Sequence, residues 1–323
     1  MASYNSGLAD RYVRKAVMKL LLIVNPSASS VTPRSQVLIQ RALSQSHDVE
    51  LGETARRGHA TRLAEAAASR GLDGVVVLGG DGTLNEVANG LAHTDTALIP
   101  LPGGSTNVFA RTLGLPDDPL EATTTVLRCL DKRLIRRVGL GRANDRLFLF
   151  HVGIGFDAAV VEQVERNGDL KRYLSHALFV YAAIRTWFTH FDRSRPHFSV
   201  TSADGTRLDD GYLTICLNTD PYTYLGSVPL NLAPGATLDT GITTVTVRTL
   251  RSDQLLRAIA ESFRGGLRSS RRVSIDESAA VVVSSDEPFP HQIDGDFLGR
   301  VSELRLSHVP DSLLLLRPDL EAV

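Results

Sequence analysis

The chain contains 323 residues, of which 43% are hydrophobic and 22% are charged, and its formal net charge is −1. This length favours two domains with a sizeable core, and the balanced charge gives no overall attraction to nucleic acid. Cys129 and Cys216 match no metal-ligand spacing, so a reduced, cytoplasmic setting is expected. No apolar run approaches the ~18 residues that span a bilayer, so any membrane contact must be made by a local surface patch.

Strands and helices alternate in the first part of the chain. Residues 1–17 are polar and lack a clear period, and we expect them to form a flexible tail. Strand-like runs follow at 19–24, 49–53, 75–78 and 97–101, with helical segments between them. This alternation predicts a Rossmann-like α/β domain, with a parallel sheet and helices on both faces. Ligands of such sheets bind at the carboxyl ends of the strands.

The stretch at 75–90 reads VVVLGGDGTLNEVANG and joins a buried strand to a helix through a glycine-rich turn. Its glycines let the backbone approach a phosphate, and the helix N-terminus favours negative charge. Asp81 is unusual there, because a carboxylate repels phosphates unless it serves a metal ion or a proton transfer. The alternative is that Asp81 and Gly82 form only a turn dipeptide.

A second glycine-rich turn, PGGSTN at 102–107, follows the next strand and also opens a helix. Ser105 or Thr106 could act there simply as an N-cap, so this turn is weak evidence on its own. Loops that follow parallel strands share one edge of the sheet. We therefore expect both glycine-rich turns to lie side by side.

The pattern changes after residue 131. Strand-like runs follow one another with turn signals between them, at 134–140, 147–152, 197–201, 212–218, 243–249, 279–283 and 301–306. Helical segments interrupt them at about 156–190 and 252–264. The pattern predicts a mainly antiparallel β second domain, with the boundary near Lys132.

At this point the chain resembles the diacylglycerol kinase catalytic family, in particular its soluble bacterial lipid kinases. These are related to sphingosine kinases and more remotely to NAD kinases. The matching motifs keep the family's order and span nearly the whole chain after residue 18: 23–26, Thr54 with 58–60, 79–86, 102–107, 153–157 and 293–296.

The resemblance implies a kinase with a nucleotide-binding domain at 18–131, a β-rich lipid-substrate domain at 132–307, and ATP in the cleft between them. The C-terminal segment 308–323 is expected to return to the first domain, with its apolar run at 313–316 as a strand or buried edge. Carried over by position, the nucleotide-lining residues would be Asn25, Pro26, Ser27, Thr54, Gly79, Gly80, Gly82, Thr83, Asn85, Glu86, Gly104, Ser105, Thr106 and Asn107.

Phosphoryl transfer needs cradled phosphates, Mg²⁺ and a base near the attacking hydroxyl. Asp81 could hold the metal or act as the base, and Asp294 and Asp296 offer a second pair of carboxylates. The family usually has Glu at the third position of this Asp-Gly motif, where it is proposed as the general base. Here Asp296 is one methylene shorter. The alternative interpretation of the pair is a hairpin turn.

Bacterial members of the family also carry a structural Mg²⁺ site in a Leu-Asp-Asp-Gly turn of the second domain. In this chain the turn is Leu-Asp-Thr-Gly at 238–241, so Thr240 stands where the ligand carboxylate would be. A neutral hydroxyl is a poor ligand for a hard cation. We therefore do not predict this site, and the protein's metal ligands are left unassigned.

Two features concern the lipid. Asp157 follows the turn at 153–156, and in sphingosine kinases a nearby Asp meets the lipid head group; its alternative role is that of an acid at a helix N-terminus. A basic cluster of Arg264, Arg268, Arg271 and Arg272 could dock on anionic lipid, although most such clusters are solvated faces. An amphipathic segment at 170–191 is more typical of core packing than of a lipid entrance.

The sequence thus favours an ATP- and Mg²⁺-dependent kinase that acts on a lipid at a membrane surface, with diacylglycerol as the first substrate and phosphatidic acid as the product. Family precedent favours a homodimer, and attachment at the inner membrane face is left open. One alternative is another lipid kinase, for example of sphingoid bases. A second is an NAD kinase, whose second motif is missing here. The third is an idle protein that binds nucleotide or lipid as a regulator.

Overall fold

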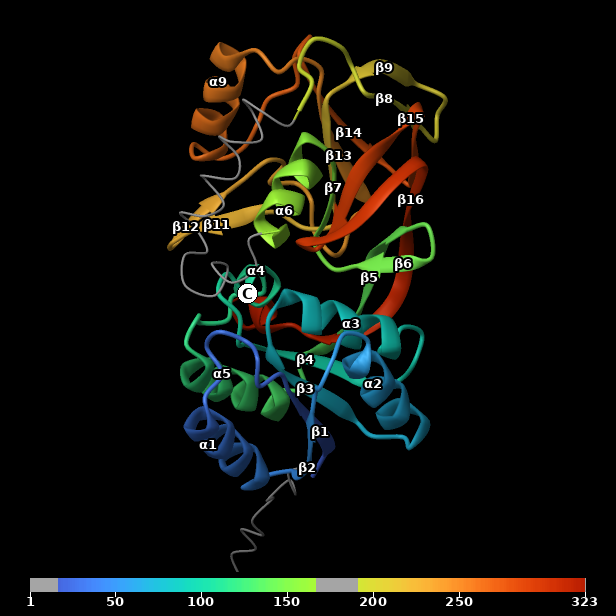
Figure 1. The fold of residues 1–323 in the computed structure, drawn as a ribbon. Coiled ribbons are helices and arrows are strands. Elements are labelled where there is room, and N and C mark those ends of the chain that lie inside the picture. The colour runs from blue at the N-terminus through green and yellow to red at the C-terminus, as the bar shows by residue number, and fades with distance from the viewer. Residues whose placement is uncertain (1–16, 167–190, 323) are drawn as a thin grey trace, which may run out of the picture.

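The computed structural model describes residues 17–166 and 191–322. The expected tail and the amphipathic segment at 170–191 lie almost wholly outside the described residues, as does the later part of the helical segment at 156–190. Figure 1 shows two lobes, with the first domain below and the second above. No helix among the described residues is long and apolar enough to cross a membrane.

The first domain is built on four parallel strands in the order β4–β3–β1–β2. They are β1 Lys19–Val24, β2 Asp48–Glu53, β3 Gly74–Gly79 and β4 Ala97–Pro102. The helices are α1 Pro33–Ser44, α2 His59–Ser69, α3 Asp81–Leu91, α4 Val108–Thr112 and α5 Pro119–Asp131.

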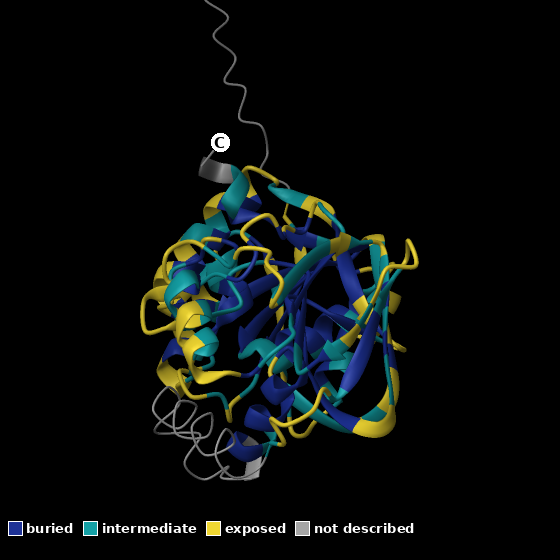
Figure 2. Ribbon diagram, turned by 90° about the horizontal axis from the view of Figure 1, so that it is seen from above, coloured by how far each residue is buried: buried dark blue, intermediate teal, exposed yellow. Residues whose placement is uncertain are grey.

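Alternate side chains of β1 enter two separate hydrophobic clusters, as the period of a strand requires. Leu20 and Leu22 pack with the cluster that contains Ile39 of α1, whereas Ile23 packs with the cluster that contains Leu84 of α3. Helices therefore cover both faces of the sheet. Figure 2 shows the buried strands in the interior and the exposed residues on the outer surfaces.

The second domain is mainly antiparallel. Its strands are β5 Ile135–Ala143, β6 Arg146–Phe148, β7 His151–Gly155, β8 Phe198–Ser202, β9 Arg207–Gly211, β10 Leu213–Leu217, β11 Thr223–Leu225, β12 Val228–Leu230, β13 Ile242–Val247, β14 Val273–Ser278, β15 Ala280–Ile293 and β16 Asp296–Leu316. Its helices are α6 Phe156–Arg166 and α9 Ser252–Ser262, and a 3₁₀ turn follows at Pro318–Ala322. The predicted fold class, a parallel α/β domain with a mainly antiparallel β domain, is confirmed.

Strand β16 joins the two domains. Its first part pairs with β15, its last part pairs with β5, and Leu315 lies opposite Leu98 of β4 in parallel register. The register shifts between Val309 and Leu313, where Asp311 has a left-handed backbone. The C-terminal run at 313–316 thus lies against the first domain.

The turn between β15 and β16 is anchored at this junction by the buried carboxylate of Asp294. Its oxygens accept hydrogen bonds from the backbone N–H groups of 149–151 at 2.7, 3.0 and 3.1 Å. They also accept from the Asn85 side chain of α3 at 2.7 Å. The predicted strand at 147–152 is therefore two strands, because the N–H groups between β6 and β7 bond to a carboxylate rather than to a strand.

The turn at 238–241 is closed by an arginine. The Arg317 guanidinium donates to both carboxylate oxygens of Asp239, at 3.2 and 3.1 Å, and to Asp319 at 2.7 to 3.1 Å. The Thr240 hydroxyl donates to the Thr237 carbonyl at 3.0 Å. These residues do not fit a hard-cation site, because a side-chain cation already occupies the carboxylate of the turn.

A first prediction concerns pH. Burial raises the pKa of the Asp294 carboxyl to about 6, against the opposing effect of its four hydrogen bonds. The folded protein therefore keeps a proton that an unfolded chain releases near pH ~4, and the free energy of unfolding should fall as pH rises from ~4 to ~6. Asp294→Asn cannot titrate, so in urea unfolding it should lose less stability over that interval, by up to about 1.4 kcal/mol per pH unit. Equal slopes for the variant and the wild type would contradict this, and Asp209→Asn on exposed β9 is the control.

A second prediction concerns Arg317, whose side chain is only 8% exposed. Arg317→Met should destabilise the fold by about 2 kcal/mol, because it removes the hydrogen bonds by which the buried guanidinium ties the turn at 238–241 to the C-terminal segment. The melting temperature should fall by several degrees, whereas EDTA should leave the wild-type value unchanged. Arg195→Met, which breaks an exposed ion pair with Glu287, should have no measurable effect. A wild-type melting temperature that falls on adding EDTA would show that a metal, and not Arg317, holds the turn.

Candidate active site

The two glycine-rich turns lie against each other at one edge of the sheet, as the sequence predicts. Gly79 and Pro102 are partners in the β3–β4 ladder, and the Gly103 N–H donates to the Gly79 carbonyl at 2.9 Å. A Cβ on Gly103 would lie 2.7 Å from the Gly79 nitrogen, and one on Gly104 would lie 2.8 Å from the Gly80 Cα. Only glycines allow this backbone contact, which brings the two turns together where α3 and α4 begin. We call this junction of the two turns the cradle.

The loop after β1 closes one side of this cradle. The Asn25 side-chain amide donates to the Thr83 hydroxyl at 3.0 Å and accepts from the Ser27 N–H at 3.0 Å. Ser30 donates to the Gly103 carbonyl from its backbone and to the Gly104 carbonyl from its hydroxyl. Pro26 and Ser27 are exposed, and the backbone of Thr54 bonds to Val24 at the same strand edge.

Asp81 is the first residue of α3, and its carboxylate binds the residues that follow the second glycine-rich turn. Its carboxylate accepts from the backbone N–H groups of Val108 and Phe109, both at 3.0 Å, at the start of α4. Burial raises the pKa of this carboxyl, while these two bonds oppose the shift. Asn107, in a left-handed conformation, accepts from the N–H groups of Gly103 and Gly104. Ser105 is exposed at the mouth of the turn, and Thr106 is half-buried.

Asn85 and Glu86, which follow on α3, contact protein groups. The Glu86 carboxylate accepts from the N–H groups of Gly58 and Ala60 and so caps α2. Asn85 is buried, and its amide donates to Asp294 and to the Leu147 carbonyl. In the described structure both side chains position neighbouring elements around the cradle.

Asp296 belongs to the second domain, and its side chain lies beside the cradle. A Cβ on Gly82 would lie 3.6 Å from the Asp296 Oδ1, so the carboxylate faces the first turn of α3. Its Oδ2 forms ion pairs with Arg57 at 3.0 Å and with Arg146 at 3.4 Å. The fold therefore places this carboxylate beside the cradle, at the start of α3.

Asp157 lies apart from the cradle, on the wall of a cavity of about 520 Å³ between α6, α9 and the strands of the second domain. Most of the lining is apolar, with Val160, Leu213 and Ile215 among its residues. The Asp157 carboxylate accepts from the Tyr222 hydroxyl at 2.5 Å and from the Gln292 amide at 2.8 Å. Burial raises the pKa of Asp157, and these two bonds oppose the shift.

Gln292 connects the cavity to the cradle. Its amide nitrogen donates to Asp157, while its amide oxygen accepts from the Gly295 N–H at 2.8 Å. Gly295 lies between Asp294 and Asp296. A single buried side chain therefore separates the polar group of the apolar cavity from the turn that carries Asp296.

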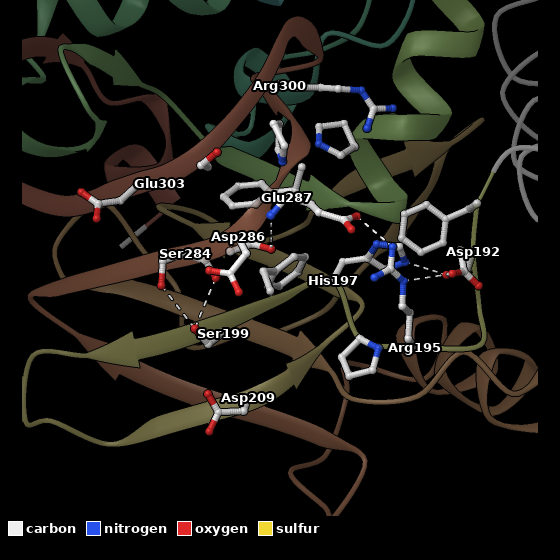
Figure 3. Close-up of a pocket in the computed structure, with 18 of the residues that line it drawn as sticks. Asp192, Arg195, His197, Ser199, Asp209, Ser284, Asp286, Glu287, Arg300 and Glu303 are labelled. Carbon is white, nitrogen blue, oxygen red and sulfur yellow. Dashed lines mark hydrogen bonds and ion pairs between the residues drawn. The ribbon is translucent and has the colours of Figure 1, made fainter.

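Another hollow of the second domain, of about 840 Å³, lies between β8, β9, β15 and β16. Figure 3 shows Arg195 in it between Asp192 and Glu287, with which it forms ion pairs. None of the predicted site residues is among its described lining residues. Its cations and carboxylates largely satisfy one another, so we do not assign it a ligand.

Four residues of the site were not identified from the sequence: Arg57, Arg146, Tyr222 and Gln292. Arg57 and Gln292 directly adjoin the recognised motifs at 58–60 and 293–296, so their positions in the sequence could have identified them. Arg146 and Tyr222 stand 150 and 65 residues from the carboxylates that they contact, so no local spacing connects them.

Comparison with known proteins agrees with this geometry. Residues 19–143 match the family model of the diacylglycerol kinase catalytic domain. Residues 151–317 match the model described as the YegS C-terminal NAD kinase beta sandwich-like domain.

A protein of Pseudomonas aeruginosa named "Probable lipid kinase YegS-like" is 31% identical over 71% of this chain and 71% of its own length. A protein of Bacillus subtilis named "Diacylglycerol kinase" is 27% identical over 86% of this chain and 89% of its own. A solved diacylglycerol kinase structure from Bacillus anthracis aligns with a TM-score of 0.68 over 93% of this chain and 97% of its own; its 22% identity supports the fold alone. The chain therefore belongs to the diacylglycerol kinase catalytic family of lipid kinases.

Proposed function

We propose that this protein transfers the γ-phosphoryl group of ATP to a lipid hydroxyl, and that diacylglycerol, converted to phosphatidic acid, is the substrate. The observation that carries the proposal is the link through Gln292 between an apolar cavity and the turn of Asp296. An apolar cavity with a few convergent polar groups suits a lipid, and the adjoining glycine-rich cradle suits a triphosphate.

On the nucleotide side, backbone N–H groups of the two glycine-rich turns other than those of Gly103 and Gly104, which are bonded within the protein, would bind the phosphates, with the Asn25 loop beside them. On the lipid side, the acyl chains would enter the cavity, and Asp157 would accept a hydrogen bond from the head group. Asp157 has lone pairs for this, because a carboxylate offers about four acceptor sites and two hydrogen bonds reach it from Tyr222 and Gln292.

Asp296 would act as the general base. Its carboxylate takes the proton of the lipid hydroxyl while the hydroxyl oxygen bonds to the γ-phosphorus and the bond from that phosphorus to the ADP oxygen breaks. Asp81 is a weaker candidate, because both of its oxygens accept hydrogen bonds from α4.

Magnesium is expected to arrive with the nucleotide. In the described part of the chain, no group of three or more His, Cys, Asp or Glu side chains could hold a metal ion. An ion held mainly by phosphates needs no such cluster, and the metal ligands of this chain are left unassigned. The ion would neutralise charge on the phosphates.

Asp296→Ala should lower kcat by about 10²- to 10⁴-fold, because it removes the general base, while ATP binding remains. The measurement is transfer of radiolabel from ATP to diacylglycerol, sphingosine, ceramide and NAD in parallel, with ATP affinity followed separately. Asp286→Ala, at an exposed position on the same hairpin, should behave as the wild type. Near-normal turnover by Asp296→Ala would exclude this residue as the base.

The same panel separates the rival functions. Label on NAD alone would identify an NAD kinase, and label on sphingosine or ceramide would identify a different lipid kinase. ATP binding without label on any acceptor would favour a regulator.

We propose further that α9 brings the cavity to an anionic membrane. Leu256, Ile259 and Phe263 recur at helical spacing and are exposed by 68%, 42% and 41%. Exposed Arg264, Arg268, Arg271 and Arg272 of the predicted basic cluster adjoin this stripe, and three of them line the cavity. An apolar face flanked by arginines is the pattern of an interfacial helix.

Vesicle pelleting tests this docking. The protein should sediment with vesicles that contain anionic phospholipid and less with neutral ones, and added salt should weaken the binding. Arg264→Gln/Arg271→Gln should lower the affinity by about 10- to 30-fold, at about 1 kcal/mol per arginine. The control Arg207→Gln/Arg305→Gln removes two exposed arginines from other strands. Binding that ignores anionic lipid content would count against the proposal.

A further inference from the structure

Arg146, at the start of β6, contacts site residues of both domains. Its Nε and Nη2 donate to the Asn85 Oδ1 at 2.9 and 2.7 Å, and its Nη2 lies 3.4 Å from the Asp296 Oδ2. Asn85 belongs to α3 of the nucleotide-binding domain, and Asp296 begins β16. One guanidinium thus joins the helix that opens at the cradle to the carboxylate that faces it.

The Arg146 guanidinium is oriented by a partner, Asn85, whose own side chain is fixed by hydrogen bonds. Asn85 is 1% exposed, and its Nδ2 donates to Asp294 at 2.7 Å and to the Leu147 carbonyl at 2.9 Å. The Asn85 oxygen must therefore point towards Arg146. The Leu147 N–H also donates to the Asn89 side chain at 3.0 Å, which holds β6 against α3.

The other arginine on Asp296 is held differently. Arg57 is 63% exposed and contacts Asp296 through one nitrogen, whereas Arg146 is 28% exposed and bonds to two partners. Both arginines pair with Oδ2, and both carboxylate oxygens lie near Gly82, with Oδ1 at 3.6 Å and Oδ2 at 3.7 Å from the position of a Cβ there. Arg146 is therefore the fixed support, and its ion pair engages Oδ2 rather than Oδ1.

We infer that Arg146 is a positioning residue for phosphoryl transfer: it holds the Asp296 carboxylate against the first turn of α3, with Oδ1 turned to the acceptor hydroxyl. This inference rests on the proposed function. In the reaction the hydroxyl proton passes to Oδ1, the hydroxyl oxygen bonds to the γ-phosphorus, and ADP leaves. Arg146 neither gains nor loses a proton. Because Asp296 is a short side chain, a small displacement would take Oδ1 out of hydrogen-bond reach.

A double-mutant cycle tests the inference, with kcat, the KM for ATP and the ATP dissociation constant measured for each protein on diacylglycerol. Arg146→Ala should lower kcat by about 10- to 100-fold, while the ATP dissociation constant stays within about twofold. In the Asp296→Ala background, Arg146→Ala should cause no further loss, because residues that act as a unit are not additive. Arg146→Lys can reach only one of the two acceptors at a time and should recover part of kcat. Arg142→Ala, on the neighbouring strand β5, is the matched control.

Three results would overturn the inference. One is a loss in the double variant equal to the product of the two single losses, and another is a weaker ATP affinity with kcat unchanged, which would make Arg146 a nucleotide ligand. The third comes from thermal unfolding of the same four proteins. If the shifts in melting temperature simply add, Arg146 and Asp296 are not coupled in the folded protein. This last measurement needs no activity, so a protein that phosphorylates none of the lipids would overturn the proposed function while still testing the contact.

Discussion

The Asp294 carboxylate accepts hydrogen bonds from three consecutive backbone N–H groups, those of Leu149 and Phe150 between β6 and β7 and that of His151 at the start of β7. Each of these groups would cost about 1–3 kcal/mol if it were buried without a partner, so the junction between the domains depends on this one side chain. The same carboxylate bonds to Asn85 of α3. These hydrogen bonds of Asp294 also fix the hairpin turn that holds Asp296, two residues further along the chain, beside the cradle. Asp294 is thus an anchor for the turn, and Asp296 is held separately by Arg57 and Arg146.

The cradle itself depends on a steric constraint. The two glycine-rich turns touch through their backbones, at distances that leave no room for a Cβ on Gly103 or Gly104. The Asp81 carboxylate accepts a hydrogen bond from the first N–H group of α4, and the Asn107 side chain accepts one from the Gly104 N–H within the second turn. Asp81 and Asn107 thereby shape the cradle, and the N–H groups of Gly103 and Gly104 are bonded within the protein. An anion would have to be bound by other N–H groups of the two turns, which suit a phosphate because they add no competing negative charge.

The parallel sheet and the adjacency of its loops followed from the sequence, because alternating strands and helices leave few topologies. The roles of individual polar residues did not follow in the same way. Asp81 and Glu86 both lie where a ligand-binding acid would lie, yet both cap helices. The local sequence pattern is the same for a ligand-binding acid and for a capping acid, so it does not distinguish the two roles. The ion pairs of Asp296 with Arg146 and of Asp239 with Arg317 join residues 150 and 78 positions apart. Such pairs are set by how β16 returns across both domains, and nothing in the spacing of the sequence encodes it.

Under the proposed function, the separation between the cavity and the cradle would let one site hold two unlike substrates. A lipid chain needs apolar walls, whereas a triphosphate needs N–H donors and nearby cations, and each would be destabilised in the other's surroundings. Gln292 lies at the boundary, fully buried, and presents its donor to Asp157 and its acceptor to the turn of Asp296. Because an amide satisfies both sides without a net charge, the boundary can stay dry. Under the proposed function, Asp157 would hold the head group on the cavity side of Gln292 while the acceptor hydroxyl reaches Asp296 on the other side, and excluding water at this point would favour transfer to the lipid over hydrolysis of ATP.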